Sequence, residues 1–294
     1  MRKKLLKGSM TIILSSLCVF IFILEASNHA IVNSSYTLTY DTLPKSFDGF
    51  NIVQLSDLHN QEFGYQNERL VQHVERLEPD IVVLTGDMVS ADDTQFNEFE
   101  SLIQSLGNRY PIFYIVGNHE QALDETDLML LKKMLLQHDV VILDNESVTL
   151  TKGHDQLHLY GLWFNLRYYS DQTNPLILND PETYYFDEDK MIELLGDKQD
   201  GFSILLAHNP VYFETYANWG ADLTLSGHLH GGMVRIPFIG GIVSPEKTWF
   251  PYYDAGLYSN EQQHLIVSRG LSAGHKGFRF FNCPEVIRIT LRCQ

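Results

Sequence analysis

Short runs of β-branched residues alternate with segments of helical periodicity between residues 50 and 136, and this rhythm limits the fold more than any other feature of the chain. The runs expected to form strands are Asn51–Leu55, Ile81–Thr85 and Ile112–Val116. The segments expected to form helices are Asn67–Leu77, Phe96–Leu106 and Glu125–Leu136. Because neighbouring parallel strands need a crossover connection, usually a helix, the pattern predicts three parallel strands with crossover helices.

The second half of the chain adds further strands at closer spacing. Residues 140–143, 147–151 and 157–163 lie near enough in sequence to pair as hairpins, which predicts a mixed sheet. The later elements expected are a helix near 190–195 and strands at 203–207, 222–225, 266–268 and 286–291. The sequence shows no repeat and no linker within this body, so one α/β domain is expected over residues 49–294.

Two segments, 164–189 and 236–258, do not follow this rhythm and are rich in Tyr, Trp, Phe, Pro and Asn. They are expected to form long loops. Such loops either pack on the surface through their own aromatic residues or form the walls of a binding cleft, and the sequence leaves both interpretations open.

The N-terminal residues have the pattern of a membrane-targeting segment. Four basic residues, Arg2, Lys3, Lys4 and Lys7, come before an uncharged run over residues 8–24. At about 1.5 Å per residue this run reaches about 25 Å, within the tolerated length of a membrane span. An uncleaved anchor over residues 1–24, followed by a juxtamembrane segment over 25–48, is favoured over a cleaved signal peptide, because the small-residue cleavage pattern is poor. In both cases the positive-inside rule predicts a body outside the cytoplasm, on the cell membrane if anchored and secreted if cleaved.

Charge and cysteine content argue against two classes of function. The chain has 37 acidic and 21 basic residues, a net charge of -16, which disfavours a broad nucleic-acid-binding face. The three cysteines, Cys18, Cys283 and Cys293, lack the paired spacing of a thiolate metal site. Whether Cys283 and Cys293 pair is left open, as is the oligomeric state.

Residues of the kinds that bind metals follow five of the predicted strands. The clusters are Asp57-x-His59, Gly86-Asp87, Gly117-Asn118-His119-Glu120, His208-Asn209 and Gly227-His228-x-His230. In open α/β sheets ligands bind at the carboxyl ends of the strands, where these clusters would converge. One cluster alone is weak evidence, but five in succession predict a metal site.

The residue types indicate which ions this site would take. Oxygen and nitrogen ligands without thiolate suit two divalent ions of manganese, iron or zinc. Two such ions held about 3.5–4 Å apart need a bridging carboxylate. Asp57 and Asp87 are the carboxylates in the clusters that suit this role.

The five clusters resemble the signature of the calcineurin-like metallophosphoesterases. Residues 52–59, 226–232, 268–271 and 279–285 are similar to the bacterial membrane-associated branch of that superfamily, which includes phosphodiesterases related to lipid-sugar pyrophosphate hydrolases. The resemblance implies a double-sheet α/β/β/α sandwich. It also implies one ion held by Asp57, His59, Asp87 and His230, and a second held by Asp87, Asn118, His208 and His228.

The same resemblance implies a mechanism. A hydroxide that bridges the two ions attacks phosphorus in line, and His119 is the nearby acid that protonates the departing alkoxide. Glu120 either orients His119 or interacts with the first turn of a helix, which is the commoner role.

Departures from the family pattern bear on the substrate. Where its Ser/Thr protein phosphatases carry two phosphate-clamping arginines, this chain has Ala91 and Val116, and Met233 stands where the bacterial branch often has Gln. The missing arginines favour a phosphodiester or pyrophosphate over a phosphomonoester. The resemblance to the membrane-associated branch implies that such a substrate is lipid- or sugar-linked. The alternatives are a phosphomonoesterase or nucleotidase, and a catalytically idle module that binds the cell envelope. The basic residues that either contact phosphate instead or belong to a solvated loop are His275, Lys276 and Arg279.

Overall fold

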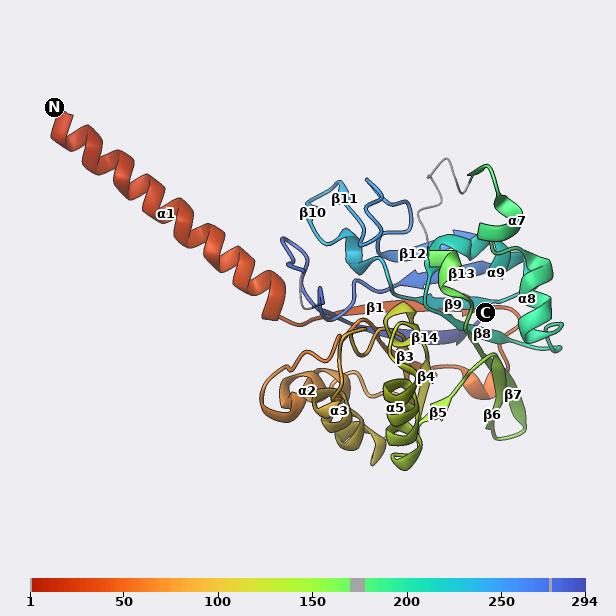
Figure 1. The fold of residues 1–294 in the computed structure, drawn as a ribbon. Coiled ribbons are helices and arrows are strands. Elements are labelled where there is room, and N and C mark those ends of the chain that lie inside the picture. The colour runs from red at the N-terminus through yellow and green to blue at the C-terminus, as the bar shows by residue number, and fades with distance from the viewer. Residues whose placement is uncertain (1, 170–177, 275–276) are drawn as a thin grey trace.

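The computed structural model describes residues 2–169, 178–274 and 277–294, and it places them in two packed β-sheets with helices on both outer sides (Figure 1). Both six-stranded sheets contain parallel and antiparallel pairs. This arrangement confirms the predicted α/β/β/α sandwich.

The first sheet contains the predicted parallel strands. In spatial order it consists of β1 (Val32–Tyr40), β14 (Glu285–Cys293), β2 (Asn51–Leu55), β3 (Ile81–Thr85), β4 (Ile112–Ile115) and β5 (Val141–Ile142). Strands β2 to β5 are parallel, whereas β14 is antiparallel to β2. The crossover helices are α2 (Glu68–Glu75), α3 (Asn97–Gly107) and α5 (Glu125–Gln137), all close to their predicted bounds.

The second sheet carries the later part of the chain. In spatial order it consists of β12 (Gly256–Asn260), β13 (Gln263–Val267), β9 (Leu223–Ser226), β8 (Ser203–Ala207), β7 (Asp155–Leu162) and β6 (Glu146–Lys152). Helices α8 (Glu188–Leu195) and α9 (Phe213–Trp219) pack on its outer face through Met191, Tyr216 and Trp219.

Alternate residues of the central strands enter two different cores, because successive side chains of a strand point to opposite faces. Val53 of β2 packs with Leu70 and Phe99 under the helices. Ile52 of the same strand packs with Leu206 between the two sheets. Strands buried on both faces have continuous apolar sequences, which is why these strands were recognisable.

One predicted pairing is wrong. Residues 140–143 were expected to form a hairpin with 147–151, but β5 pairs parallel to β4, with Val141 opposite Phe113. The hairpin that does form joins β6 and β7 in the other sheet. The chain passes from one sheet to the other between Ile142 and Glu146, so strands adjacent in sequence belong to different sheets.

Strand β1 lies within the stretch 25–48, where only a juxtamembrane segment was expected. It pairs with β14 along all nine of its residues. It forms the edge of the first sheet and carries Asn, Ser and Thr at most of its positions, so its sequence lacks the apolar run of a central strand. The domain division at residues 24 and 48 stays a prediction, but residues 32–40 belong to the sheet.

Helix α1 (Arg2–His29) projects away from the body as a long rod (Figure 1). Its segment Ile12–His29 is long and apolar enough to cross a membrane, and 6% of this segment is buried within the molecule. It includes most of the uncharged run that predicts a membrane segment.

The two segments expected to be loops are largely irregular, although residues 170–177 of the first lie outside the described residues. Their short elements are η3 (Leu166–Tyr169), α7 (Pro181–Tyr184), β10 (Arg235–Ile236) and β11 (Gly240–Gly241). The other short helices are η1 (Lys45–Phe47), η2 (Tyr65–Asn67), α4 (Asn118–Gln121), η4 (Pro210–Tyr212) and η5 (His230–Gly232). Cys283 and Cys293 are free thiols.

Candidate metal centre

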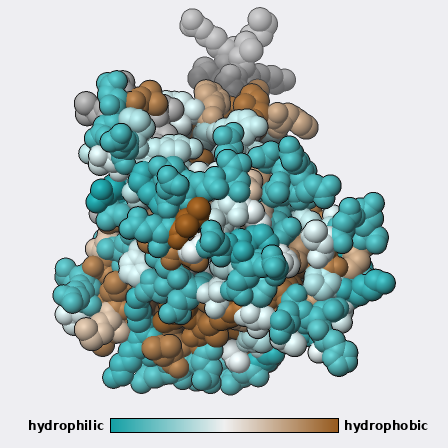
Figure 2. Space-filling view, turned by 90° about the vertical axis from the view of Figure 1, so that its right-hand side faces the viewer, coloured by the Kyte–Doolittle hydropathy of each residue, from teal (hydrophilic) through white to brown (hydrophobic). Residues whose placement is uncertain are grey.

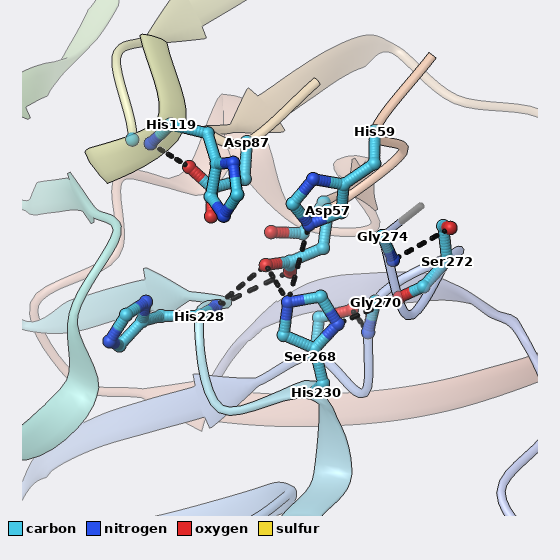
Figure 3. A network of polar contacts seen from close by, with 12 residues as sticks. Asp57, His59, Asp87, His119, His228, His230, Ser268, Gly270, Ser272 and Gly274 are labelled. Carbon is cyan, nitrogen blue, oxygen red and sulfur yellow. Dashed lines mark hydrogen bonds and ion pairs between the residues drawn. The ribbon is translucent and has the colours of Figure 1, made fainter. Parts of the chain in front are cut away.

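Each residue predicted to bind metal lies at or just beyond the carboxyl end of a strand. Asp57 and His59 follow β2, Asp87 follows β3, and Asn118 begins α4 after β4. The second sheet contributes His208 after β8, and His228 and His230 after β9. The close-up in Figure 3 shows several of these side chains turned toward a common space between the strand ends of the two sheets.

The backbone at the site is unusual. Asp57, His59, Asp87, His228 and His230 all have φ between 48° and 69°, the left-handed region that non-glycine residues rarely adopt. Hydrogen bonds between loops hold this conformation: the N–H of Asp57 donates to O of Gly86 (3.0 Å), and the N–H of His59 donates to O of Asp87 (3.1 Å). Backbone strain of this kind is concentrated at functional sites.

The side chains form two overlapping groups whose potential ligand atoms lie within 4.8 Å of one another. The first group is Asp57, His59, Asp87 and His230, and the second is Asp87, His208 and His228. All six residues are buried, and Asp87 belongs to both groups. Apart from Asn118, which lies outside both groups, these are the residues of the two ligand sets that the family resemblance implies.

The hydrogen bonds of the imidazoles suit metal binding. Nδ1 of His208 donates to O of Thr85 (2.6 Å), and Nδ1 of His230 donates to O of Ser272 (2.7 Å). When each ring is neutral, its lone pair is then on Nε2, which faces the group. Nε2 of His230 lies 3.3 Å from Nε2 of His59, a contact between two nitrogens that a cation would relieve.

A further sign is a buried acceptor. Oδ1 of Asn118 is buried and has no hydrogen-bond partner among the described residues. Unpaired buried polar atoms are rare and call for an explanation such as a bound ion. A neutral amide oxygen here fits the role that the resemblance implies for Asn118.

The pKa shifts favour ligand-competent protonation states in the first group. Burial and the neighbouring His230 lower the pKa of His59, and burial lowers the pKa of His230 to about 4, despite the opposing charge of Asp57. In the second group burial opposes ionisation, but the attraction between Asp87 and His208 is stronger. It holds the pKa of Asp87 below its usual value and raises the pKa of His208 to about 9.

Glu120 has a larger structural role than predicted. Its carboxylate accepts the backbone N–H groups of Asp87 (2.9 Å), Met88 (2.6 Å) and Gly117 (2.8 Å). The bond to Gly117 caps α4, which is the predicted helix role, and the other two tie the loop after β3 to the same carboxylate. Burial and the charge of Asp87 raise the pKa of Glu120 to about 7. Among the described residues, this carboxylate makes no hydrogen bond to the His119 ring, whose Nδ1 is paired with Ala91.

His119 is half-buried beside the first group. Its ring lies 4.6 Å from that of His59 in an edge-to-face arrangement. Its backbone N–H donates to Oδ1 of Asp87 (2.8 Å), and its Nδ1 accepts the N–H of Ala91 (3.1 Å). The ring proton is therefore on Nε2.

Glu246 is a site residue that the sequence analysis missed. Its Oε1 lies 2.7 Å from Nε2 of His228. Metal-binding histidines are commonly oriented by such a carboxylate. Glu246 lies in the loop 236–258, and the ring of Tyr169 in the loop 164–189 lies 5.0 Å from His228, so both long loops reach the site. Nothing in the local sequence distinguishes Glu246 from an ordinary acidic loop residue.

Arg279 was expected either to contact phosphate or to belong to a solvated loop, and both interpretations are wrong. Arg279 is buried, and Nη2 donates to the carbonyl oxygens of Arg269 and Ser272 (2.6 Å each), so its guanidinium neither reaches a phosphate nor lies in solvent. It instead supports the strand-end loop whose Ser272 oxygen holds His230. His275 and Lys276 lie outside the described residues.

Comparisons with known proteins agree with this geometry. The family model for calcineurin-like phosphoesterases matches residues 50–232. The uncharacterized metallophosphoesterase YkuE of Bacillus subtilis is 28% identical over 273 residues, covering 90% of this chain and 86% of its own. The phosphodiesterase YaeI of Escherichia coli is 27% identical and covers 82% of each chain. The UDP-2,3-diacylglucosamine pyrophosphatase LpxG of Chlamydia muridarum is 27% identical and covers 85% of this chain and 86% of its own.

Proposed function

The chain belongs to the calcineurin-like phosphoesterase family, and on this premise we propose that it is a two-metal phosphodiesterase or pyrophosphohydrolase, anchored by α1 with its body outside the cytoplasm. As a member of this family it is a phosphoester hydrolase. The observation that carries the two-metal proposal is that Asp87 is shared by both ligand groups, as a bridging carboxylate would be.

The residues present fit two divalent ions of manganese, iron or zinc, since their donors are oxygen and nitrogen. When bound, the two ions supply Lewis acidity and an activated nucleophile at phosphorus. The residues that would hold one ion are Asp57, His59, Asp87 and His230, and those that would hold the other are Asp87, Asn118, His208 and His228.

His119 would act on the phosphate group or on the leaving oxygen. With Nδ1 occupied by the N–H of Ala91, the ring presents an Nε2 proton. A hydrogen bond from this proton stabilises charge on the phosphate oxygens, and its transfer to the departing alkoxide would contribute about 10²- to 10⁴-fold in rate. The bond from its backbone N–H to Asp87 keeps the ring beside the bridging carboxylate.

The charge around the site favours a diester or pyrophosphate. His119 lines a cavity of about 700 Å³, in which Lys247 is the one lysine or arginine among the described lining residues. Position 116 is a buried valine and has no guanidinium to offer. The guanidinium of Arg279 is used by main-chain oxygens and is not offered to phosphate. A dianionic monoester needs more cationic donors than a singly charged diester. The activities named for YaeI and LpxG support this choice, and the name of LpxG's substrate motivates a lipid- or sugar-linked one here.

Hydrolysis of bis-(p-nitrophenyl) phosphate and of p-nitrophenyl phosphate by the manganese-loaded full-length protein in detergent micelles tests this proposal. We expect the diester to react faster, and we expect Asp87→Asn to bind fewer ions and to be inactive. Faster hydrolysis of the monoester would instead support the phosphomonoesterase or nucleotidase. A protein that binds two ions and hydrolyses neither compound would support the idle envelope-binding module.

The role of His119 is tested with diesters of increasingly poor leaving groups. If His119 protonates the leaving oxygen, the defect of His119→Gln grows from p-nitrophenol to alkyl alcohols and reaches about 10²- to 10⁴-fold. A defect that is equal for all leaving groups would contradict proton donation and leave charge stabilisation as its role.

The orientation of the body is tested by protease treatment of sealed membrane vesicles. We expect the body to be digested in right-side-out vesicles and protected in inverted ones. The reverse pattern would contradict the proposed location.

A further inference from the structure

The end of α1 nearest the body is attached to the loop that precedes β14. Nδ2 of Asn28 donates to O of Arg279, and the N–H of Arg279 donates to Oδ1 of Asn28, both at 3.0 Å. The N–H of Phe281 donates to Oγ of Ser27 (2.9 Å). These hydrogen bonds fix the end of the helix to residues 279–281 of the body.

The same loop also contacts the apolar part of α1. The rings of Phe20 and Phe280 have centroids 5.4 Å apart. Phe20 lies nine residues before His29, about 13 Å along the helix axis, and inside the segment Ile12–His29 that could cross a membrane. The loop therefore reaches the depth at which α1 would enter a bilayer.

Large apolar side chains are exposed on the loop 278–281 that contacts α1 and on the loop 236–250, whose Phe238 and Ile239 line one cavity with Phe281. The exposed side chains are Phe238, Ile239, Trp249, Phe250, Phe278 and Phe281. Scattered exposed apolar residues are ordinary, but a connected apolar surface marks an interaction site.

Main-chain hydrogen bonds connect the two loops. The N–H of Arg235, just before the loop 236–250, donates to O of Phe280 (3.0 Å), and the N–H of Phe280 donates to O of Met233 (3.4 Å). Figure 1 shows the β10 and β11 loop on the side of the body from which α1 rises. By contrast, the face shown in Figure 2 is mostly hydrophilic, with scattered apolar patches.

We propose that these two loops, residues 236–250 and 278–281, form a membrane-docking surface that enters the boundary between lipid headgroups and acyl chains. The occupant is a lipid bilayer because the exposed surface is joined, through Phe280, to a helix with the length and composition of a membrane span. Aromatic side chains are the residues most suited to that boundary, where an apolar face sinks about 5–10 Å below the surface. The proposal rests on the proposed anchoring by α1.

Docking would set the position of the active-site cavity. Met233, Lys247 and Gly277, which lie within or beside the two loops, line the same cavity as His119. When the loops contact the bilayer, this cavity is held beside the lipid surface. The surface thus determines where the protein meets its substrate, in addition to the tethering provided by α1.

Trp249 provides a native probe for this proposal. It is one of three tryptophans in the chain, and α1 contains none. Trp249 is 69% exposed, whereas Trp219 is 7% exposed. The full-length protein is reconstituted in liposomes of phosphatidylcholine and phosphatidylglycerol, with or without bromine atoms on the acyl chains, which quench tryptophan at close range. We expect brominated lipid to reduce the emission by up to about a third. Of the three tryptophans that emit, only Trp249 would lie at the interfacial depth.

Two variants make the assay specific. Trp249→Phe should remove the quenching and keep the aromatic surface. Adding Leu136→Trp to that variant places an exposed tryptophan on α5, away from α1 in Figure 1, and no quenching is expected there. Equal quenching at position 136 would overturn the proposal.

Flotation of the same liposomes separates the two hypotheses. If the protein floats with the lipid and Trp249 is not quenched, anchoring holds and the docking surface is wrong. If the protein does not float, anchoring by α1 fails and the docking proposal fails with it.

Discussion

Replacing Gly86 by alanine should destabilise the protein and disrupt the second ligand group, because Gly86 occupies a space that no side chain fits. Its φ is +87°, and an added Cβ would lie 2.7 Å from Nδ1 of His208 and 2.8 Å from Cα of Gly117. Contacts of Cβ atoms below 3.0 Å essentially do not occur. The imidazole cannot move freely, because its Nδ1 donates to O of Thr85 at 2.6 Å.

The cost has two parts. The positive φ costs an L residue about 1–3 kcal/mol. Forcing an extra methyl group into a packed site costs about 1–3 kcal/mol more. Gly196→Ala is the matched control, because Gly196 has φ +73° and an added Cβ there meets no described atom within 4 Å. The difference between the two variants, about 1–3 kcal/mol, isolates the clash.

Urea unfolding of the metal-free full-length protein in micelles, followed by near-ultraviolet circular dichroism, gives both free energies. Metal content after dialysis gives the second readout. We expect Gly196→Ala to keep the metal content of the unmodified protein. Gly86→Ala should bind less, because a His208 ring displaced by more than about 0.5 Å loses its ligand geometry. If Gly86→Ala equals Gly196→Ala in both measurements, the argument from close packing is refuted.

Two further predictions concern the second ligand group. Glu246→Gln removes the charge that faces His228 and should weaken manganese binding by about 10- to 100-fold in a chelator competition assay; unchanged affinity would show that this contact does not support the site. Burial lowers the pKa of His208, but the charge and hydrogen bond of Asp87, with the charge of Asp57, together outweigh burial and raise this pKa from 6.5 to about 9. The metal-free protein therefore has this stabilisation, on the order of 3 kcal/mol, below pH 6.5 and loses it as the pH rises through 9. Metal affinity should rise over the same window, because the ion displaces the His208 proton; thermal unfolding and calorimetric titration would contradict this if both were independent of pH.

Local patterns account for the parts of the fold that were predicted correctly. β2 and β3 are mostly apolar because each packs under helices on one face and against the second sheet on the other. Helix α2 is amphipathic because one face is solvated. The site could be predicted for the same reason. Asp57, Asp87 and His208 each follow a recognisable strand, and the carboxyl ends of such strands meet at one edge.

Sequence by itself therefore determined the layered α/β body, the apolar N-terminal segment and the residue types that gather at the strand ends. The tertiary structure decided what depends on partners distant in the chain. β1 is a strand because β14 lies beside it, β5 joins β4 because the chain changes sheets after Ile142, and Arg279 is buried because main-chain oxygens surround it. Glu246 reaches His228 from a loop 18 residues away. Local periodicity reports which face of an element is buried, but only the packed chain decides which residue lies against that face.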